Sequence, residues 1–403
     1  MRGERARLIV IGGGPAGSAT ATLLARAGLA VVLLDRRRFP RDKPCAEYLS
    51  PACEDVLQRL GALERLEQHG LRRVRGMTLI SPSGWRCTIE YYDGSCPRSA
   101  LTMPRLQLDQ VLLELARATG VDVREGIVVR GPLLEGRRVV GVRALGPQPD
   151  VEQEIIADLV IGADGRTSVL AGALGLRRPV RWPRRLGLVT HYEMPALPDG
   201  TGEMYVGRRS YCGLAPLPGG RVNVAAVVPL PRPGEHLSAA ARLERALAAL
   251  PLLQERLANA RRVKPVTGAA PLAHVVRAPA GDGFLLVGDA AGFFDPFTGE
   301  GIYKALRGAE LAAEVVSDAM RWGRSAAWYA PRYHQLRRQE FLARDVLSRL
   351  VQLFVQTPRL FDYAVERLAR RGELRSRLGA ALGDLAGAGP LLSPVFLARL
   401  LRP

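Results

Sequence analysis

The sequence predicts an α/β fold in which a parallel sheet is combined with an antiparallel-sheet insertion and a C-terminal helical region. A strand-turn-helix-strand pattern fills residues 8–35, and strand and helix patterns continue to alternate up to about residue 180. Between 181 and 265 the chain changes to short strands punctuated by aromatic residues and prolines, which is typical of a separate antiparallel sheet. From about residue 310 a Leu- and Arg-rich helical pattern runs to Pro403. These three observations define the fold class.

The first strand, Leu8–Ile11, leads into the glycine-rich turn Gly12-Gly13-Gly14-Pro15-Ala16-Gly17, a helix to Ala27 and a second strand, Ala30–Leu34. This is the dinucleotide-binding fingerprint of a Rossmann-like unit: Gly12 makes the tight turn, Gly14 lets the backbone approach a pyrophosphate, and Gly17 lets helix and strand pack closely. Asp35 ends the second strand, where a carboxylate can accept hydrogen bonds from a ribose. The helix N-terminus, at Pro15 and Ala16, would face the phosphates.

An irregular segment with several prolines, residues 39–51, follows this unit and is predicted to be an ordered loop entering a helix near Ala52. It contains Cys45. The pattern leaves open whether Cys45 serves chemistry or is simply a buried cysteine in a connector.

Later segments continue the α/β layer with an amphipathic helix over Arg105–Ala118 and strands near 121–129 and 139–142. A further strand ends in the Asp164-Gly165 turn. The apolar strand 283–287 leads to Asp289, and a helix is predicted from Ile302. An acid beyond a strand and beside a new helix N-terminus indicates a ligand site, although an aspartate capping a helix is the alternative.

Composition narrows the function classes. The chain has 403 residues, of which 47% are hydrophobic and 24% charged, as in globular proteins, and it carries a formal charge of +18. Only three of the 57 basic residues are lysines, and the arginines are scattered along helical patterns, so we expect a solvated surface and no nucleic-acid partner. The excess charge suits an anionic partner such as a phosphorylated cofactor, a diphosphate-bearing substrate or an acidic membrane.

The five cysteines form no C-x-x-C pair, which indicates a reducing cytoplasm and no metal site. The run from Leu8 has no signal-peptide cleavage site, and no uncharged apolar run is long enough to cross a bilayer. The region after 310, with breaks at Pro358 and at 387–390, is predicted either to cap the fold or to touch the inner face of the membrane as a basic amphipathic surface. No obligate protein partner is indicated.

Taken in order, these motifs resemble those of FAD-dependent oxidoreductases with the p-hydroxybenzoate hydroxylase type of fold, over residues 7–320. The resemblance implies a discontinuous FAD-binding domain (1–74, 101–180 and 266–320), a substrate-binding β-sheet domain (75–100 and 181–265) and a C-terminal helical region (321–403). It assigns to the cofactor Gly12, Gly14, Pro15, Ala16, Gly17, Asp35, Arg36, Arg105, Val129, Asp164, Asp289, Pro296, Gly299, Gly301 and Ile302.

Within that group the chain is most similar to the geranylgeranyl reductase branch. The K-x-C-G motif corresponds to Lys43-Pro44-Cys45-Ala46, and G-D-A-A-G is followed by Pro296 and Gly299-Glu300-Gly301-Ile302. Aromatic hydroxylases usually have histidine in place of Gly292. The Y-x-W-x-F-P cavity motif is present only as Tyr211 to Pro216, without its tryptophan and phenylalanine, which implies a differently shaped substrate site that includes Tyr211, Gly213 and Pro216.

The resemblance implies that NAD(P)H reduces FAD and that the reduced flavin passes a hydride to a C=C bond of a hydrophobic, isoprenoid or quinone-like substrate. Cys45 or a nearby water would supply the proton, and the backbone N–H groups of Gly301 and Ile302 would stabilise charge on the flavin. The alternatives are an FAD-dependent monooxygenase of an aromatic or polyketide-like compound, a flavin-dependent halogenase, and a flavin-binding protein without turnover.

Overall fold

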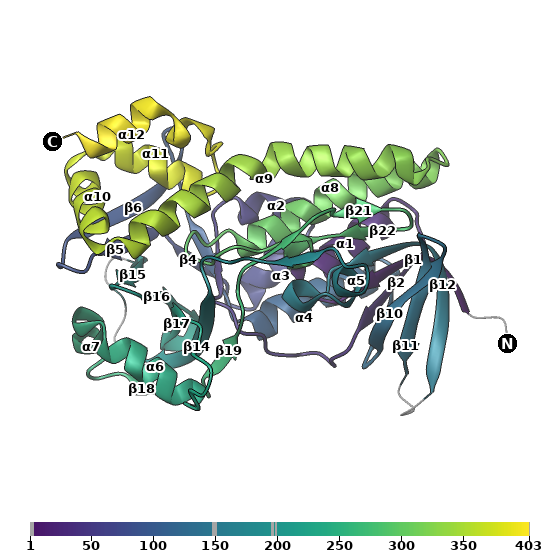
Figure 1. Cartoon of the computed structure of the whole chain (residues 1–403), viewed down its shortest axis with the longest axis horizontal. Coiled ribbons are helices and arrows are strands. Elements are labelled where there is room, and N and C mark those ends of the chain that lie inside the picture. Colours follow the sequence, from purple (N-terminus) through teal and green to yellow (C-terminus); the bar gives the residue numbers. More distant parts are fainter. Residues whose placement is uncertain (1–3, 147–150, 195–196, 198–199, 403) are drawn as a thin grey trace.

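The computed structural model describes residues 4–146, 151–194, 197 and 200–402. Figure 1 shows two large β-sheets at opposite ends of the molecule, with helices packed over them. The long helix α9 (Ala326–Gln356) runs along the molecule and connects the helices over the first sheet with those at the C-terminus.

The first sheet has eight strands among the described residues, and its centre is parallel. β1 lies between β2 and β12, which both run parallel to it, and β22 runs parallel to β12. The antiparallel strands β10 and β11 extend one side. The strands are β1 (Glu4–Ile11), β2 (Val31–Asp35), β9 (Asp122–Glu125), β10 (Val128–Glu135), β11 (Arg138–Leu145), β12 (Glu152–Gly162), β21 (Ala280–Gly281) and β22 (Phe284–Leu286).

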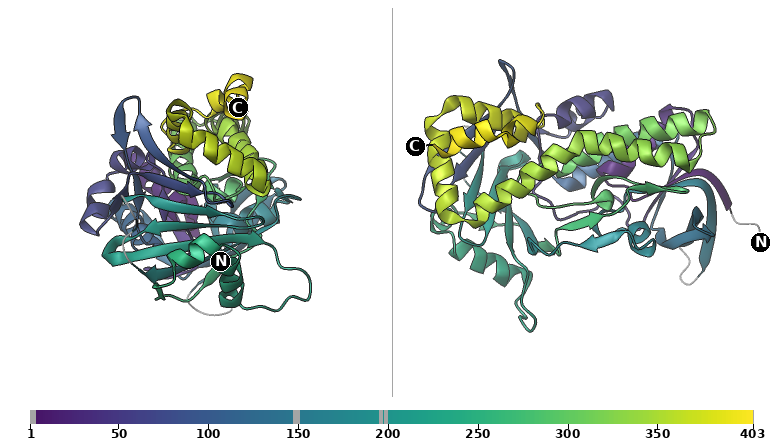
Figure 2. Two further views of the ribbon diagram at one scale, coloured as in Figure 1. Left: turned by 90° about the vertical axis from the view of Figure 1, so that its left-hand side faces the viewer. Right: turned by 45° about the horizontal axis from the view of Figure 1, so that its top comes forward.

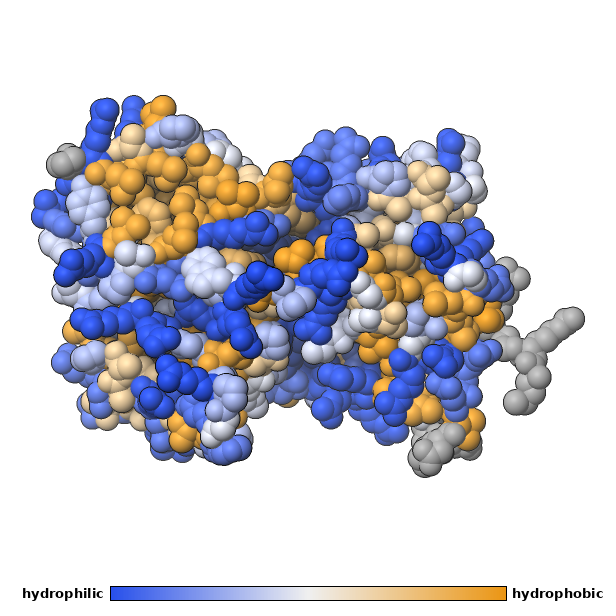
Figure 3. All heavy atoms as spheres, viewed as in Figure 1, coloured by the Kyte–Doolittle hydropathy of each residue, from blue (hydrophilic) through white to orange (hydrophobic). Residues whose placement is uncertain are grey.

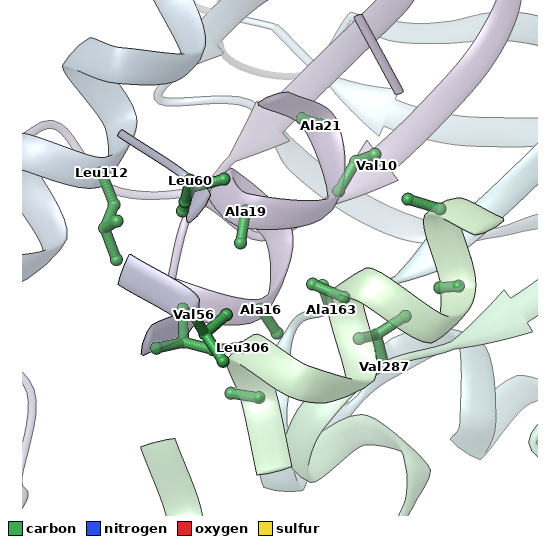
Figure 4. Close-up of a cluster of buried hydrophobic side chains, with 14 of the residues drawn as sticks. Val10, Ala16, Ala19, Ala21, Val56, Leu60, Leu112, Ala163, Val287 and Leu306 are labelled. Atoms are coloured by element: carbon green, nitrogen blue, oxygen red, sulfur yellow. The ribbon is translucent and has the colours of Figure 1, made fainter. Parts of the chain in front are cut away.

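Close packing of α1 (Pro15–Arg26) against this sheet depends on small residues. A Cβ atom on Gly17 would lie 1.8 Å from the carbonyl oxygen of Gly12, so only glycine fits there. Ala16 and Ala19 of α1 face Leu306 of α8 (Gly301–Arg321) in the buried cluster of Figure 4. The predicted strand-turn-helix-strand unit is therefore confirmed, and the glycine-rich turn holds the helix against the strand.

The second sheet is a mainly antiparallel sheet of nine strands in the described part of the chain. Its buried faces carry alternating apolar side chains, as in β6, because one face packs on a core. The strands are β5 (Gly76–Ile80), β6 (Arg86–Asp93), β7 (Cys96–Arg98), β14 (Arg185–Glu193), β15 (Gly202–Val206), β16 (Tyr211–Pro216), β17 (Arg221–Pro229), β18 (Arg261–Arg262) and β19 (Thr267–Ala269).

Short elements join the two sheets. A three-stranded sheet pairs β8 (Ala100–Thr102) with β3 (Tyr48–Leu49) and β4 (Arg72–Val74), so the segment predicted as a loop contains a short strand. β13 (Arg177–Pro179) pairs with β20 (His274–Val276). The connecting helices are α2 (Cys53–Arg59), α3 (Leu63–Gln68), α4 (Arg105–Ala118), α5 (Val169–Ala173), α6 (Ala239–Ala248) and α7 (Pro251–Arg256), with single turns η1 (Gly165–Thr167), η3 (Pro218–Gly220) and η4 (Gly288–Ala291).

The predicted C-terminal helical region consists of the remaining part of α9 and of α10 (Pro358–Arg370), α11 (Gly372–Leu382), η5 (Gly389–Leu392) and α12 (Pro394–Leu401). In Figure 2 these helices lie over one end of the second sheet. Pro358 begins α10, where its missing N–H costs nothing, so the predicted break is a helix start. Among the described residues, no helix combines the length and apolar character needed to span a membrane.

The division into domains stays a prediction, but the sheets show where one boundary differs. β19 lies after residue 265, within the range assigned to the FAD-binding domain, yet it pairs with β14 of the second sheet. The chain therefore leaves the second sheet a few residues later than the sequence pattern indicated.

We predict that Gly17→Ala lowers the free energy of unfolding by about 1–3 kcal/mol, because the new methyl group cannot be accommodated without moving α1 from β1. Urea unfolding followed by circular dichroism measures the change. The matched control is Gly172→Ala in α5, where a Cβ would meet nothing within 4 Å. Equal stability of the Gly17→Ala variant and the original protein would contradict this account of the turn.

Candidate active site

A cavity of about 450 Å³, which we call the polar cavity, opens at the carboxyl ends of β1 and β2. It is the switch point of a parallel sheet, where such folds bind ligands. Six residues predicted for the cofactor line it: Gly12, Gly14, Asp35, Arg36, Val129 and Asp164. The other lining residues are Ile11, Leu34, Arg37, Arg41, Asp42, Lys43, Pro44, Ile127, Val128, Arg130, Ala163, Thr167 and Val169.

The glycine-rich turn is held in place by Asp35. Its carboxylate accepts hydrogen bonds from the backbone N–H of Gly13 at 2.7 Å and from that of Arg37 at 2.8 Å. Helix α1 follows this turn without a side-chain cap, so its first N–H groups are available to an anion. The sequence predicted a ribose contact for Asp35, which stays a prediction, but gave no sign of its bond to Gly13.

Asp164 meets the polar cavity from the opposite wall. Its Oδ2 accepts the backbone N–H of Val169 at 2.7 Å, whereas Oδ1 is buried and has no hydrogen-bond partner among the described residues. Burial raises the pKa of this carboxyl group. An unpartnered carboxylate oxygen at a cavity wall requires a donor, and the hydroxyl groups of a dinucleotide supply one. The polar cavity therefore fits FAD at both walls.

Arg105 lies behind the polar cavity, and its position depends on Asp109. Both side chains are buried, and Nε and Nη2 of Arg105 donate to the two oxygens of Asp109 at 2.8 and 2.7 Å. Arg41, which lines the cavity, donates to the same carboxylate at 2.9 Å. Burial alone would lower the pKa of Arg105, but Asp109 and the thiol of Cys45 raise it above its ordinary value. Arg105 thus supports Cys45 and does not itself line the cavity.

Cys45 lies between two cavities. Lys43 and Pro44 line the polar cavity, whereas Ala46 and Tyr48 line a second cavity of about 60 Å³, which we call the apolar cavity. The thiol is free and partly exposed, and its sulfur accepts the N–H of Glu47 at 3.3 Å. The expected alternative of a fully buried connector cysteine does not fit this exposure.

Sequence reasoning missed Glu47, whose carboxylate ties this loop to both sheets. Oε1 accepts the backbone N–H of Arg105 at 2.9 Å, and Oε2 accepts hydrogen bonds from His191 of β14 at 2.7 Å and Asn223 of β17 at 2.9 Å. Asn223 also donates to the carbonyl oxygen of Cys45. Glu47 is fully buried with a positive φ of 57°, a conformation unusual outside glycine. An acid beside the Cys45 motif was the signal available in the sequence.

The apolar cavity lies between the second sheet and the segment before α8. Of the predicted residues it brings together Gly213, Pro296 and Gly299. The hydrophobic side chains around it were not predicted. The other lining residues are Ala46, Tyr48, Met77, Leu79, Ile89, Tyr91, Met204, Leu214, Ala215, Phe297, Thr298 and Leu382.

Two predicted substrate residues do not line this cavity. Tyr211 is buried, and its hydroxyl donates to Asp295 at 2.5 Å because a buried phenol needs an acceptor. Its ring packs edge-on against Phe297, so it supports the wall. Asp295 also accepts from Gln352, and burial raises the pKa of this acid to about 6. Pro216 is paired within the second sheet, and its carbonyl accepts from Thr102.

The Gly-Asp motif lies in η4, directly after β22, beside both charged walls. The carboxylate of Asp289 is near Lys43, whose pKa is lowered chiefly by burial, and near Arg166. The alternative that Asp289 caps a helix is wrong, since Glu300 occupies the N-cap position of α8. Gly301 and Ile302 form the first turn of α8, which also has no side-chain cap. Their roles toward a flavin stay predictions.

Comparisons with known proteins agree with this geometry. The FAD binding domain family model matches residues 5–341. A menaquinone reductase of Mycolicibacterium smegmatis is 30% identical, with 94% of this chain and 92% of the relative covered. Digeranylgeranylglycerophospholipid reductase 2 of Methanopyrus kandleri is 30% identical over 83% and 82%. The structure of the flavin-dependent brominase Bmp2 superposes with a TM-score of 0.82 and 21% identity, covering 94% of each chain.

We predict that Asp289→Ala weakens FAD binding about tenfold or more, because a hydroxyl of the cofactor loses a charged acceptor. The ratio of flavin to protein absorbance after gel filtration measures occupancy. Asp282→Ala is the control, since that carboxylate is 55% exposed on the other side of β22. If the Asp289→Ala variant kept full occupancy, the assignment of this acid to the cofactor would be wrong.

Proposed function

The chain belongs to the FAD-binding domain family and is an FAD-dependent oxidoreductase, and from this premise we propose that it reduces C=C bonds of a hydrophobic, isoprenoid or quinone-like substrate with electrons from NAD(P)H. The observation that carries the proposal is the position of Cys45 between the polar and the apolar cavity. A group held in one cavity and a substrate held in the other meet at this thiol.

When bound, FAD supplies hydride transfer, and the protein supplies position and charge. The glycine-rich turn, Asp35 and Asp164 would hold its dinucleotide part in the polar cavity. The uncapped N-terminus of α8 supports a role for the N–H groups of Gly301 and Ile302 in stabilising negative charge on the ring system.

Cys45 is suited to deliver a proton to the substrate. A thiol is a weak acid, and Arg105 next to it stabilises the thiolate that remains after the proton has left. The bond from Glu47 N–H to the sulfur and the bond from Asn223 to the Cys45 carbonyl fix the thiol in one orientation. General acid catalysis requires this combination of a fixed position and a stabilised conjugate base.

The lining of the apolar cavity supports a hydrocarbon substrate. Methionine, leucine and isoleucine side chains dominate it, and methionines adapt to irregular chains. Two relatives bear the names of reductases that act on menaquinone and on a digeranylgeranyl lipid, compounds with long isoprenoid chains. Oxygen-dependent chemistry, either hydroxylation or halogenation, is the competing reading because the fold is shared with a brominase.

We predict that NADPH or NADH reduces the bound flavin anaerobically and that a menaquinone or a geranylgeranyl lipid then reoxidises it without oxygen. Stopped-flow absorbance measures both half-reactions. In Cys45→Ser the reduction is unchanged, whereas substrate-dependent reoxidation slows roughly 10²-fold or more. Cys96→Ser, at an exposed thiol, is the control. Reoxidation only with oxygen, with a hydroxylated or halogenated product, would contradict the proposal.

We also propose that the C-terminal helices dock on an anionic bilayer. Hydrophobic side chains gather over these helices at the upper left of Figure 3. Here α9 to α12 surround a hollow of about 90 Å³ lined almost wholly by apolar groups, and it shares Leu79, Phe297 and Leu382 with the apolar cavity. Leu342, Val346 and Leu353 are exposed on one face of α9.

Charge supports an anionic surface as the partner. Residues 321–403 contain fifteen arginines and six acids. Each of the six acids already bonds to a described side chain or backbone group, so the surplus is positive. Arginines around an apolar patch favour lipid head groups of opposite charge. Such docking would place the shared apolar path next to membrane-dissolved substrates.

We predict that the FAD-loaded protein sediments with phosphatidylglycerol vesicles and far less with phosphatidylcholine vesicles. Leu353→Asp should weaken binding about tenfold, because an apolar contact is replaced by a repelled charge. Leu134→Asp is the control, since both leucines are 52% exposed and Leu134 lies on β10 of the first sheet. Equal binding of the Leu353→Asp and Leu134→Asp variants would refute the docking surface.

A further inference from the structure

A third cavity, of about 630 Å³, lies outside both cavities described above and shares no lining residue with them. We call it the arginine pocket. It lies beside the pair β13 and β20 and the segment that follows β13. It is lined by Arg177, Pro179, Val180, Arg181, Pro183, Arg184, Leu230, Pro271, Ala273 and His274.

The charge of the arginine pocket is uncompensated. Its three arginines face no acid in the lining, and none of them forms an ion pair with a carboxylate in the part of the chain that the structure describes. Arg177 is instead close to two further basic groups, Arg166 and His274. Arg181 and Arg184 are exposed to solvent. Several guanidinium groups around one cavity match phosphate oxygens, which they bind in pairs.

His274 adds a polar group of a different kind. It is 3% exposed, and burial, together with the charge of Arg177, lowers its pKa, so its ring is neutral at pH 7. Nε2 donates to the carbonyl oxygen of Asp289 at 2.8 Å. The other nitrogen, Nδ1, is then an acceptor, and it is buried without a hydrogen bond to any described residue. A ligand for this pocket therefore carries a hydroxyl or amide donor as well as phosphate.

Only one layer of residues separates the arginine pocket from the polar cavity. Asp164 and Thr167 line the polar cavity, and Arg166, between them in the chain, donates to the carbonyl oxygen of Pro271 at 2.5 Å, which lines the arginine pocket. On the other side His274 bonds to Asp289 of the Gly-Asp motif. The pocket is thus built on the back of the two motifs assigned to FAD.

We propose that the arginine pocket binds the phosphates of the nicotinamide dinucleotide that reduces FAD. This rests on the proposed function, which requires NAD(P)H. The sequence has no second complete glycine-rich dinucleotide fold to hold that donor, and the arginine pocket provides a site of the required charge. In the step served, a hydride leaves the dihydronicotinamide ring, which becomes oxidised nicotinamide, and the flavin gains that hydride and one proton from solvent.

An isoprenoid diphosphate carries the same phosphate chemistry. It suits the arginine pocket less well, because its chain would need a continuous path to the apolar cavity and the two share no lining residue. It also lacks the donor group that Nδ1 of His274 requires.

Calorimetric titration of the FAD-loaded protein with NADP⁺, NAD⁺, inorganic pyrophosphate and geranylgeranyl diphosphate tests the proposal. We expect a pyridine dinucleotide to bind and R181A/R184A to weaken it about tenfold or more, with FAD occupancy unchanged. R178A/R277A is the matched control, since it removes two exposed arginines next to the same strand pair but outside the lining. It should change the affinity less than threefold.

Affinity unchanged in R181A/R184A, an equal loss in both double variants, or binding of geranylgeranyl diphosphate but of neither dinucleotide would overturn the proposal. Anaerobic mixing with NADPH and NADH separates this inference from the proposed function. If a dinucleotide binds in an Arg181- and Arg184-dependent way but its reduced form leaves the flavin oxidised, the pocket stands as a binding site and its role in electron supply falls.

Discussion

The carboxylate of Glu47 is the contact on which the arrangement of this molecule depends. It is buried between the two sheets and is neutralised by three donors from separate elements: α4, β14 and β17. A buried charge of this kind is strongly destabilising when any partner is lost, so the sheets and the loop that carries Cys45 keep one relative position. The positive φ at Glu47 turns the chain there, so that Cys45 and Tyr48 lie on either side of the turn.

This fixed loop explains how separate cavities act together. Lys43 and Cys45 lie near the buried Arg105 and Asp109, and Arg41 joins the same carboxylate from the polar cavity. The apolar cavity begins at the next residue and continues toward the hollow between the C-terminal helices. The arginine pocket adjoins the Asp164 and Asp289 motifs from outside. Donor, flavin and substrate would thus approach one region from three directions.

Local patterns allowed much of this to be predicted. The glycine spacing of the first turn and the acids Asp35, Asp164 and Asp289 follow from short-range geometry, and the structure brings the first two of these acids to one cavity. Contacts between distant segments left no local signal. The bonds from Glu47 to β14 and β17 join residues far apart in sequence, and Tyr211 faces Asp295 because of sheet packing that spacing cannot show. Cavity linings from four or more elements are unpredictable for the same reason.

The central claim is that a bound flavin reaches Cys45 at the junction of the two cavities. The rate of alkylation of each cysteine by iodoacetamide, followed by mass spectrometry with and without FAD, measures this most directly. Cys53, Cys87 and Cys212 are buried, and exposed Cys96 serves as an internal reference. The account predicts that FAD slows alkylation of Cys45 several-fold and leaves Cys96 unchanged. Equal rates for Cys45 in both forms would contradict it.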